Sequence, residues 1–302
     1  MSVSAEIAIC DVSPSDGLQN ERVSLDPSVR AELVDRLAAC SVPKIEVAGL
    51  GGPDAMGTMS GGPELLASLP RRSATVYAAG VFDEQGFDQA VTGGVTEVRY
   101  VIPVTEAFSE HTQGITVAEA IARSKQLTAL SRRAGVRFSV TLAAAFGCPF
   151  GEKVETGRVL EVAGHVLLEE PPDELVLADT IGVGVPTQVR DRVRGVQALR
   201  VGVIGCHFHN TRNTGIANAV AAVENGATLL DGSVGGTGEC SFAPGASGNV
   251  ATEDVVYTLH GMGLATGIDL DRLIDTGRWL GGQLGKEMPS MVGRAGSFVA
   301  AV

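Results

Sequence analysis

Two histidines stand at the end of an apolar segment, separated by a single residue. They are His207 and His209, with Phe208 between them, and they follow the run VGVIGC. Alternate side chains of a strand point to the same face, so both imidazoles should lie on one side and Phe208 on the other. This arrangement is suited to binding a metal ion, although the same pattern also occurs as ordinary polar residues at a strand end.

A divalent ion held by two imidazoles also needs oxygen ligands. Asp16, which follows the first apolar segment, and Asn249, in a turn-rich segment, are the best-placed candidates. Imidazole nitrogens combined with carboxylate and amide oxygens favour an open octahedral site for Mg, Mn or Co over a closed structural zinc site. A divalent metal cofactor bound here would be Mg, Mn or Co, with Mg or Mn expected above all, and a polar strand end without a metal ion is the alternative.

One cysteine lies outside any apolar pattern. Residues 235–240 read GGTGEC, and this composition favours a mobile loop because glycine lowers the cost of unusual backbone dihedrals. The thiol of Cys240 could move over a substrate there and act as a general acid or base, although composition alone does not assign that role. The five cysteines are widely spaced and none forms a CxxC pair, which argues against a disulfide framework or a zinc knuckle.

Short apolar segments alternate with helical patterns along the whole chain. Eight such units in about 265 residues match a TIM barrel, an α/β fold of eight parallel strands, with a doubly wound sheet as the alternative. No linker divides the chain, so we expect one domain over 1–302, with the barrel at about 7–265. Extra C-terminal helices are expected at about 269–287, and a weakly ordered tail at 293–302. The expected strands lie near 7–13, 44–49, 75–81, 97–104, 137–146, 174–181, 201–209 and 229–235, and the expected helices near 27–40, 116–133, 155–168, 187–199, 213–225 and 251–263.

In a barrel, the polar residues at the C-terminal strand ends converge on one mouth, where enzymes of this architecture work. Asp16 follows the first predicted strand and Glu46 lies in the second. Asp179 and Thr180 end the sixth, and His207 and His209 end the seventh. The sequence therefore predicts one site built from several strands.

Composition narrows the classes of partner. The chain carries 23 Lys and Arg against 35 Asp and Glu, a formal charge of −12, which repels nucleic acid and anionic lipid. Hydrophobic residues make up 44% and the mean hydropathy is +0.20, as in a chain with a large buried core. No stretch reaches the roughly 18 apolar residues that a membrane span needs. We expect a soluble cytoplasmic protein with no nucleic acid or membrane partner.

The sequence resembles the 3-hydroxy-3-methylglutaryl-CoA lyase family, metal-dependent TIM-barrel lyases related to isopropylmalate synthase. The resemblance covers about residues 7–287. It rests on DGLQNE at 16–21, IEV at 45–47, AFGCP at 145–149, DTIGVG at 179–184, the HFH triplet, and the run from Gly235 to Asn249 that continues into ATEDVVY. The related synthases share the aspartate and the histidine pair but lack the cysteine loop, which favours the lyase branch.

The resemblance implies a reaction and a role for each matching residue. The reaction is retro-Claisen cleavage of hydroxymethylglutaryl-CoA, or a related 3-hydroxy-3-carboxyalkyl-CoA, to acetyl-CoA and a keto acid. The implied partners are an acyl-CoA substrate and a second copy of the chain in a homodimer. The implied site consists of the metal ligands Asp16, His207, His209 and Asn249, the catalytic residues Cys240, Asp179 and Glu46, and the substrate-binding residues Gln19, Ser15 and Thr180.

This chain departs from the family pattern beside the metal aspartate. Ser15 stands where the family has an arginine expected to stabilise an enolate oxygen. Residues 48–53 and 210–213 also differ from the family pattern, so the substrate mouth is expected to be remodelled. The alternatives to the first reading are therefore a lyase or Claisen-type synthase for a different acyl-CoA, and a catalytically silent metal-binding homologue.

Overall fold

A computed structural model describes residues 6–51, 62–69, 74–151, 153–239, 242 and 247–298. Its eight strands are all parallel and pair in sequence order, and the eighth pairs with the first. The predicted TIM barrel is therefore confirmed. The strands are β1 (Ala8–Asp11), β2 (Lys44–Leu50), β3 (Val76–Val81), β4 (Glu97–Pro103), β5 (Arg137–Ala143), β6 (Glu174–Asp179), β7 (Val203–Phe208) and β8 (Leu229–Gly232).

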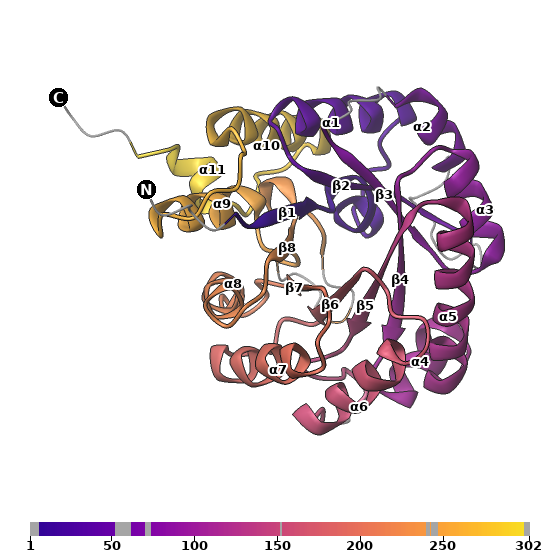
Figure 1. Cartoon of the computed structure of the whole chain (residues 1–302). Coiled ribbons are helices and arrows are strands. Elements are labelled where there is room, and N and C mark those ends of the chain that lie inside the picture. The colour runs from indigo at the N-terminus through magenta and orange to yellow at the C-terminus, as the bar shows by residue number, and fades with distance from the viewer. Residues whose placement is uncertain are drawn as a thin grey trace.

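Helices surround the barrel on the outside (Figure 1). The six predicted helices are present, and α2, α3 and α4 are additional. Helix α10 matches the predicted C-terminal helix, and α11 extends into the segment expected to be weakly ordered. The helices are α1 (Pro27–Ala39), α2 (Gly62–Ser68), α3 (Glu84–Thr92), α4 (Glu106–Gln113), α5 (Val117–Ala134), α6 (Thr156–Leu167), α7 (Pro186–Ala198), α8 (Gly215–Glu224), α9 (Thr252–Gly261), α10 (Leu270–Leu284) and α11 (Met291–Ala295), with a π-helical turn η1 (Ser13–Gly17) and a 3₁₀ turn η3 (Val234–Gly236).

Local sequence signals set the ends of the longest outer helix. Helix α5 begins at a capping box, in which the side chains of Thr116 and Glu119 each bind the backbone N–H of the other. It ends at Gly135, which adopts the left-handed conformation that glycine accepts without strain. The apolar face between these ends, including Leu127, packs on the barrel. In the part of the chain that is described, no helix combines the length and apolarity needed to cross a bilayer.

The interior of the barrel is polar along part of its axis. At the N-terminal strand ends, the buried Lys44 ammonium bridges Glu97 and Glu174 at 2.7 and 2.6 Å. Two residues further along their strands lie Glu46 and Arg99, which form an ion pair of 2.9 Å. Charged side chains therefore occupy two successive levels of the barrel, and the upper level faces the C-terminal mouth.

Candidate active site

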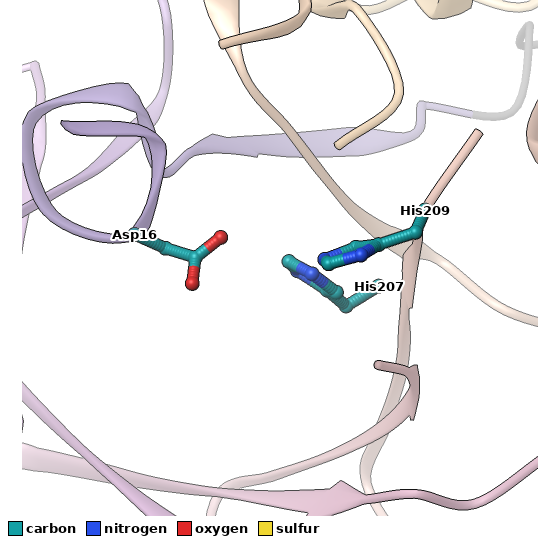
Figure 2. A group of neighbouring side chains, drawn as sticks. All are labelled: Asp16, His207 and His209. Carbon is teal, nitrogen blue, oxygen red and sulfur yellow. The ribbon is translucent and has the colours of Figure 1, made fainter. Parts of the chain in front are cut away.

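Three predicted metal ligands meet at the C-terminal mouth. One ligand atom from each of Asp16, His207 and His209 lies within 4.8 Å of the other two. Figure 2 shows the Asp16 carboxylate facing both imidazoles, which extend from the end of β7. The two rings are 5.3 Å apart, and the intervening Phe208 is buried against Phe146 on the opposite face of the strand. The alternation predicted for the triplet is confirmed.

The π-helical turn η1 carries Asp16 into the mouth. Asp11 at the end of β1 accepts hydrogen bonds from the backbone N–H and hydroxyl of Ser13, at 2.9 and 2.5 Å. The same hydroxyl oxygen accepts from the N–H of Val234, 2.6 Å away, which ties the turn to the loop after β8. Gly17 is required at the contact between them, because a Cβ there would lie 2.7 Å from the hydroxyl of Thr237.

Asn249, the fourth predicted ligand, lies against this group. Its Nδ2 donates to Asp16 Oδ2 at 2.7 Å and to the carbonyl of Thr237 at 3.1 Å. Its Oδ1 is buried and has no hydrogen-bond partner among the described residues. A backbone bridge pairs Asn249 with His209, so the loop after β8 lies alongside the end of β7.

The polar atoms that lack a partner fit a divalent cation. Asn249 Oδ1 and His209 Nδ1 are both buried without a partner in the described structure, and buried polar atoms are otherwise almost always satisfied. Burial and the neighbouring His207 lower the pKa of His209 to about 4, so the ring is neutral at pH 7, as a metal ligand must be. The nitrogen and oxygen donors suit an open site.

A second carboxylate lies behind His207. Asp231 Oδ2 is 3.4 Å from His207 Nδ1, and both Asp231 oxygens accept from Arg99 Nη2, at 3.1 and 2.8 Å. Burial alone lowers the pKa of His207, but the contact with Asp231 and the charge of Asp16 outweigh it and raise the pKa overall. A carboxylate on the second ring nitrogen is the usual way to orient a ligating histidine.

Asp231 and Arg99 were not among the residues predicted from the sequence. Each is a charged residue inside an apolar strand, in the runs LLDG and EVRYVIP. A charged side chain at such a position costs free energy to bury unless it has a partner, so a lone charge in an apolar strand indicates a buried partner nearby.

Glu46 reaches the cavity from β2 and is held at both oxygens. Ser15 Oγ donates to Oε1 at 2.5 Å and Arg99 Nη1 donates to Oε2 at 2.9 Å. Burial raises the pKa of the Glu46 carboxyl, while Arg99 and Ser15 oppose the rise. Ser15, predicted to bind substrate, is not among the residues that line the cavity and is instead a hydrogen-bond donor to a candidate base.

These groups open into a cavity of about 470 Å³. The four predicted metal ligands line this cavity, as do Gln19, Thr180 and Glu46. Its apolar lining includes Phe82, Phe108 and Phe242. Asp179 does not line it. Its carboxylate accepts from the N–H groups of Val183 and Gly184, each at 2.9 Å, and so holds the turn that presents Thr180.

Cys240, the predicted proton donor, lies outside the described residues. Its neighbours Glu239 and Phe242 both line the cavity. The N–H of Gly238 donates to Glu21 at 3.3 Å, and Lys286, just after α10, binds the same carboxylate at 2.5 and 2.6 Å. A partly buried ion pair thus anchors the beginning of the cysteine loop to the C-terminal segment.

Comparison with known proteins shows the family of this chain. A family model described as HMGL-like matches residues 6–280. The chain belongs to the HMGL-like family. It is therefore a carbon–carbon lyase, as predicted from the sequence.

Individual relatives match over nearly their whole length. The (R)-citramalyl-CoA lyase of Chloroflexus aurantiacus is 38% identical, over 96% of this chain and 95% of the relative. The hydroxymethylglutaryl-CoA lyase of Pseudomonas mevalonii is 36% identical, over 96% of each. Among solved structures, the HMG-CoA lyase of Bacillus subtilis gives a TM-score of 0.93 at 31% identity, over 98% of this chain and 99% of the other. The HMG-CoA lyase of Acinetobacter baumannii, solved with coenzyme A and 3-methylmalate, gives 0.93 at 31%, over 100% and 99%.

Proposed function

We propose that this chain cleaves the CoA thioester of a carboxylated 3-hydroxy acid by a retro-Claisen reaction, releasing acetyl-CoA and a keto acid. The observation that carries the proposal is the convergence of Asp16, His207 and His209 on a cavity that also contains Glu46. The relatives are named as lyases of hydroxymethylglutaryl-CoA and citramalyl-CoA, which favours this reaction over the synthase and silent-homologue alternatives.

The proposed cofactor is Mg²⁺ or Mn²⁺, held by Asp16, His207, His209 and the Oδ1 of Asn249. The unpartnered buried oxygen of Asn249 and nitrogen of His209 support this assignment. When bound, such an ion polarises the substrate hydroxyl and neutralises the charge that develops during cleavage.

The protein's own groups supply the proton transfers. Glu46 is a fixed carboxylate at the cavity and is proposed to accept the proton of the substrate hydroxyl, directly or through a water molecule. Cleavage of the C2–C3 bond then leaves the acetyl-CoA enolate. The proposed donor to its carbon is Cys240, whose described neighbours line the cavity. Asp179 is proposed to act by holding the turn at Thr180, while Gln19 and Thr180 contact substrate.

Two substrates differing by one methylene are the candidates. Hydroxymethylglutaryl-CoA would yield acetoacetate, and citramalyl-CoA would yield pyruvate. One methylene in a pocket is worth roughly 1–3 kcal/mol, or about 10- to 200-fold in kcat/KM. We propose citramalyl-CoA as the better substrate, because the citramalyl-CoA lyase has the higher identity of the two relatives compared, 38% against 36%.

The test is steady-state cleavage of both thioesters by Mn²⁺-loaded protein, with pyruvate and acetoacetate measured separately. Pyruvate release with the higher kcat/KM is expected. Higher kcat/KM for acetoacetate release would reverse the substrate assignment, and absence of either keto acid would refute the proposed reaction.

We also propose that the chain is a single domain that forms a homodimer in the cytoplasm. The dimer is supported by the family resemblance. A reducing compartment is supported by Cys10, Cys40, Cys148 and Cys206, which are all free thiols buried in the structure.

A further inference from the structure

Arg99 holds together the groups behind the cavity. Its Nη1 donates to Glu46 at 2.9 Å, and its Nη2 donates to both oxygens of Asp231. Asp231 in turn lies 3.4 Å from Nδ1 of His207. One guanidinium therefore links the candidate base to the residue that orients a metal ligand, and these groups come from four different strands.

Arg99 also contributes positive charge to a cavity that is lined mainly by acidic charged groups. Among the described residues that line the cavity, Arg99 is the one lysine or arginine. Four carboxylates line it as well, those of Asp16, Glu46, Asp231 and Glu239. A divalent ion and Arg99 together carry three positive charges, so most of this negative charge is offset only when both are present. Removing Arg99 would leave two buried carboxylates repelling each other and the anionic substrate.

The geometry of the guanidinium matters as well as its charge. Arginine presents its N–H groups in a rigid fork, whereas a lysine ammonium is a point charge. Arg99 uses one nitrogen for Glu46 and the other for Asp231, and its side chain is buried. The fork therefore fixes the separation of the two carboxylates.

The barrel contains a natural control for this arrangement. Lys44 is also buried and also bridges two carboxylates, Glu97 and Glu174, but at the level nearer the N-terminal strand ends. It does not line the cavity. A purely structural need for a buried cation in the barrel would apply to Lys44 and Arg99 alike.

We propose that Arg99 is a positioning residue of this lyase, which fixes Glu46 at the cavity and, through Asp231, holds His207 in the orientation that binds the metal ion. The proposal rests on the proposed function for its kinetic consequences. Its effect on metal binding is independent of turnover.

The experiment compares Arg99→Met, Arg99→Lys and Lys44→Met. Each variant is measured for melting temperature, for Mn²⁺ affinity by calorimetry on metal-free protein, and for kcat and KM separately. Outer partners of metal ligands typically contribute about 10- to 100-fold in affinity or activity. Arg99→Met is therefore expected to lose about that factor in both kcat and Mn²⁺ affinity, with a smaller change in KM. Arg99→Lys should recover part of the Mn²⁺ affinity, and Lys44→Met should lose melting temperature while keeping kcat and Mn²⁺ affinity.

The proposal is overturned if Arg99→Met affects kcat and Mn²⁺ affinity no more than Lys44→Met does. Should Arg99→Met fail to fold, Arg99→Lys decides alone, because it keeps the charge but not the fork. A reduced kcat in that variant supports the proposal, and an unchanged kcat overturns it. If the unmodified protein cleaves neither thioester, the proposed function fails, while the Mn²⁺ comparison still tests Arg99.

Discussion

Replacing Asp231 with asparagine should weaken metal binding without unfolding the barrel. Asparagine has the same shape, and its Oδ1 can still accept from Arg99. However, the oxygen that faces His207 Nδ1 at 3.4 Å becomes an NH₂ group or loses its charge. Carboxylate partners of metal-ligating histidines are worth about 10- to 100-fold in affinity. Because the 3.4 Å contact is long, we expect the lower part of that range, about tenfold, or 1.4 kcal/mol.

The assay is calorimetric titration of Mn²⁺ into metal-free protein. Asp173→Asn is the matched control, since Asp173 makes a hydrogen bond of 2.8 Å to the N–H of Phe138 at the far end of the barrel. The control should bind Mn²⁺ as the unmodified chain does. A folded Asp231→Asn variant that binds Mn²⁺ with undiminished affinity would show that His207 needs no carboxylate partner to bind the ion.

Three further predictions concern the loops around the site. Asn249→Ala removes both the NH₂ group that binds Asp16 and the buried Oδ1 that has no partner. Mn²⁺ affinity measured by calorimetry should therefore fall about tenfold or more, and unchanged affinity would exclude Asn249 as a ligand. Glu253 accepts a hydrogen bond from the N–H of Gly235, and burial raises the pKa of its carboxyl to about 8. The folded protein therefore keeps a proton on Glu253 that the unfolded chain has released, so the free energy of unfolding falls as pH rises from about 4.5 to 8. Glu253→Gln should therefore gain about 3 kcal/mol relative to the unmodified chain between pH 5 and 8 in urea unfolding, and a constant difference would contradict this. Lys286→Met leaves the buried Glu21 carboxylate without its cation and should lower the free energy of unfolding by about 2 kcal/mol. The double variant with Glu21→Gln should recover much of this loss, and no recovery would show that the ion pair does not stabilise the fold.

The parallel barrel was predictable because its strands carry a simple signal. Each is a short apolar run, as expected for strands covered on both faces, and the spacing between runs leaves room for one helix. Helices α3 and α4 were not predicted, since both are short and depend on local caps. Asp83 accepts from Gly86 N–H at the start of α3, and Thr105 accepts from Phe108 N–H at the start of α4.

The placement of the two histidines on one face was predictable for a different reason. A period of two fixes the relative orientation of His207 and His209 whatever the rest of the chain does. The π-helical turn that presents Asp16 was not predictable, because SPSDG has the composition of an ordinary loop. Its shape comes from contacts with Asp11 and Val234, which is 221 positions away from Ser13.

The outer partners of the site were missed because their meaning depends on register. Arg99 and Asp231 are single charges in apolar strands, and only the closed barrel brings them within 3 Å of each other. Asp179 illustrates the opposite case. The sequence places it at a strand end, but its carboxylate binds the amides of the turn that follows and does not line the cavity.

The metal dependence of the proposed lyase is tested most directly by titrating Mn²⁺ into EDTA-treated, dialysed protein while keto acid release from citramalyl-CoA and hydroxymethylglutaryl-CoA is followed. We expect no cleavage without metal, and a return of activity whose half-saturation equals the calorimetric dissociation constant. In His209→Ala both curves should shift together to higher Mn²⁺. Full cleavage by the metal-free protein, or activity in His209→Ala that returns at unchanged Mn²⁺, would contradict a lyase centred on Asp16, His207 and His209.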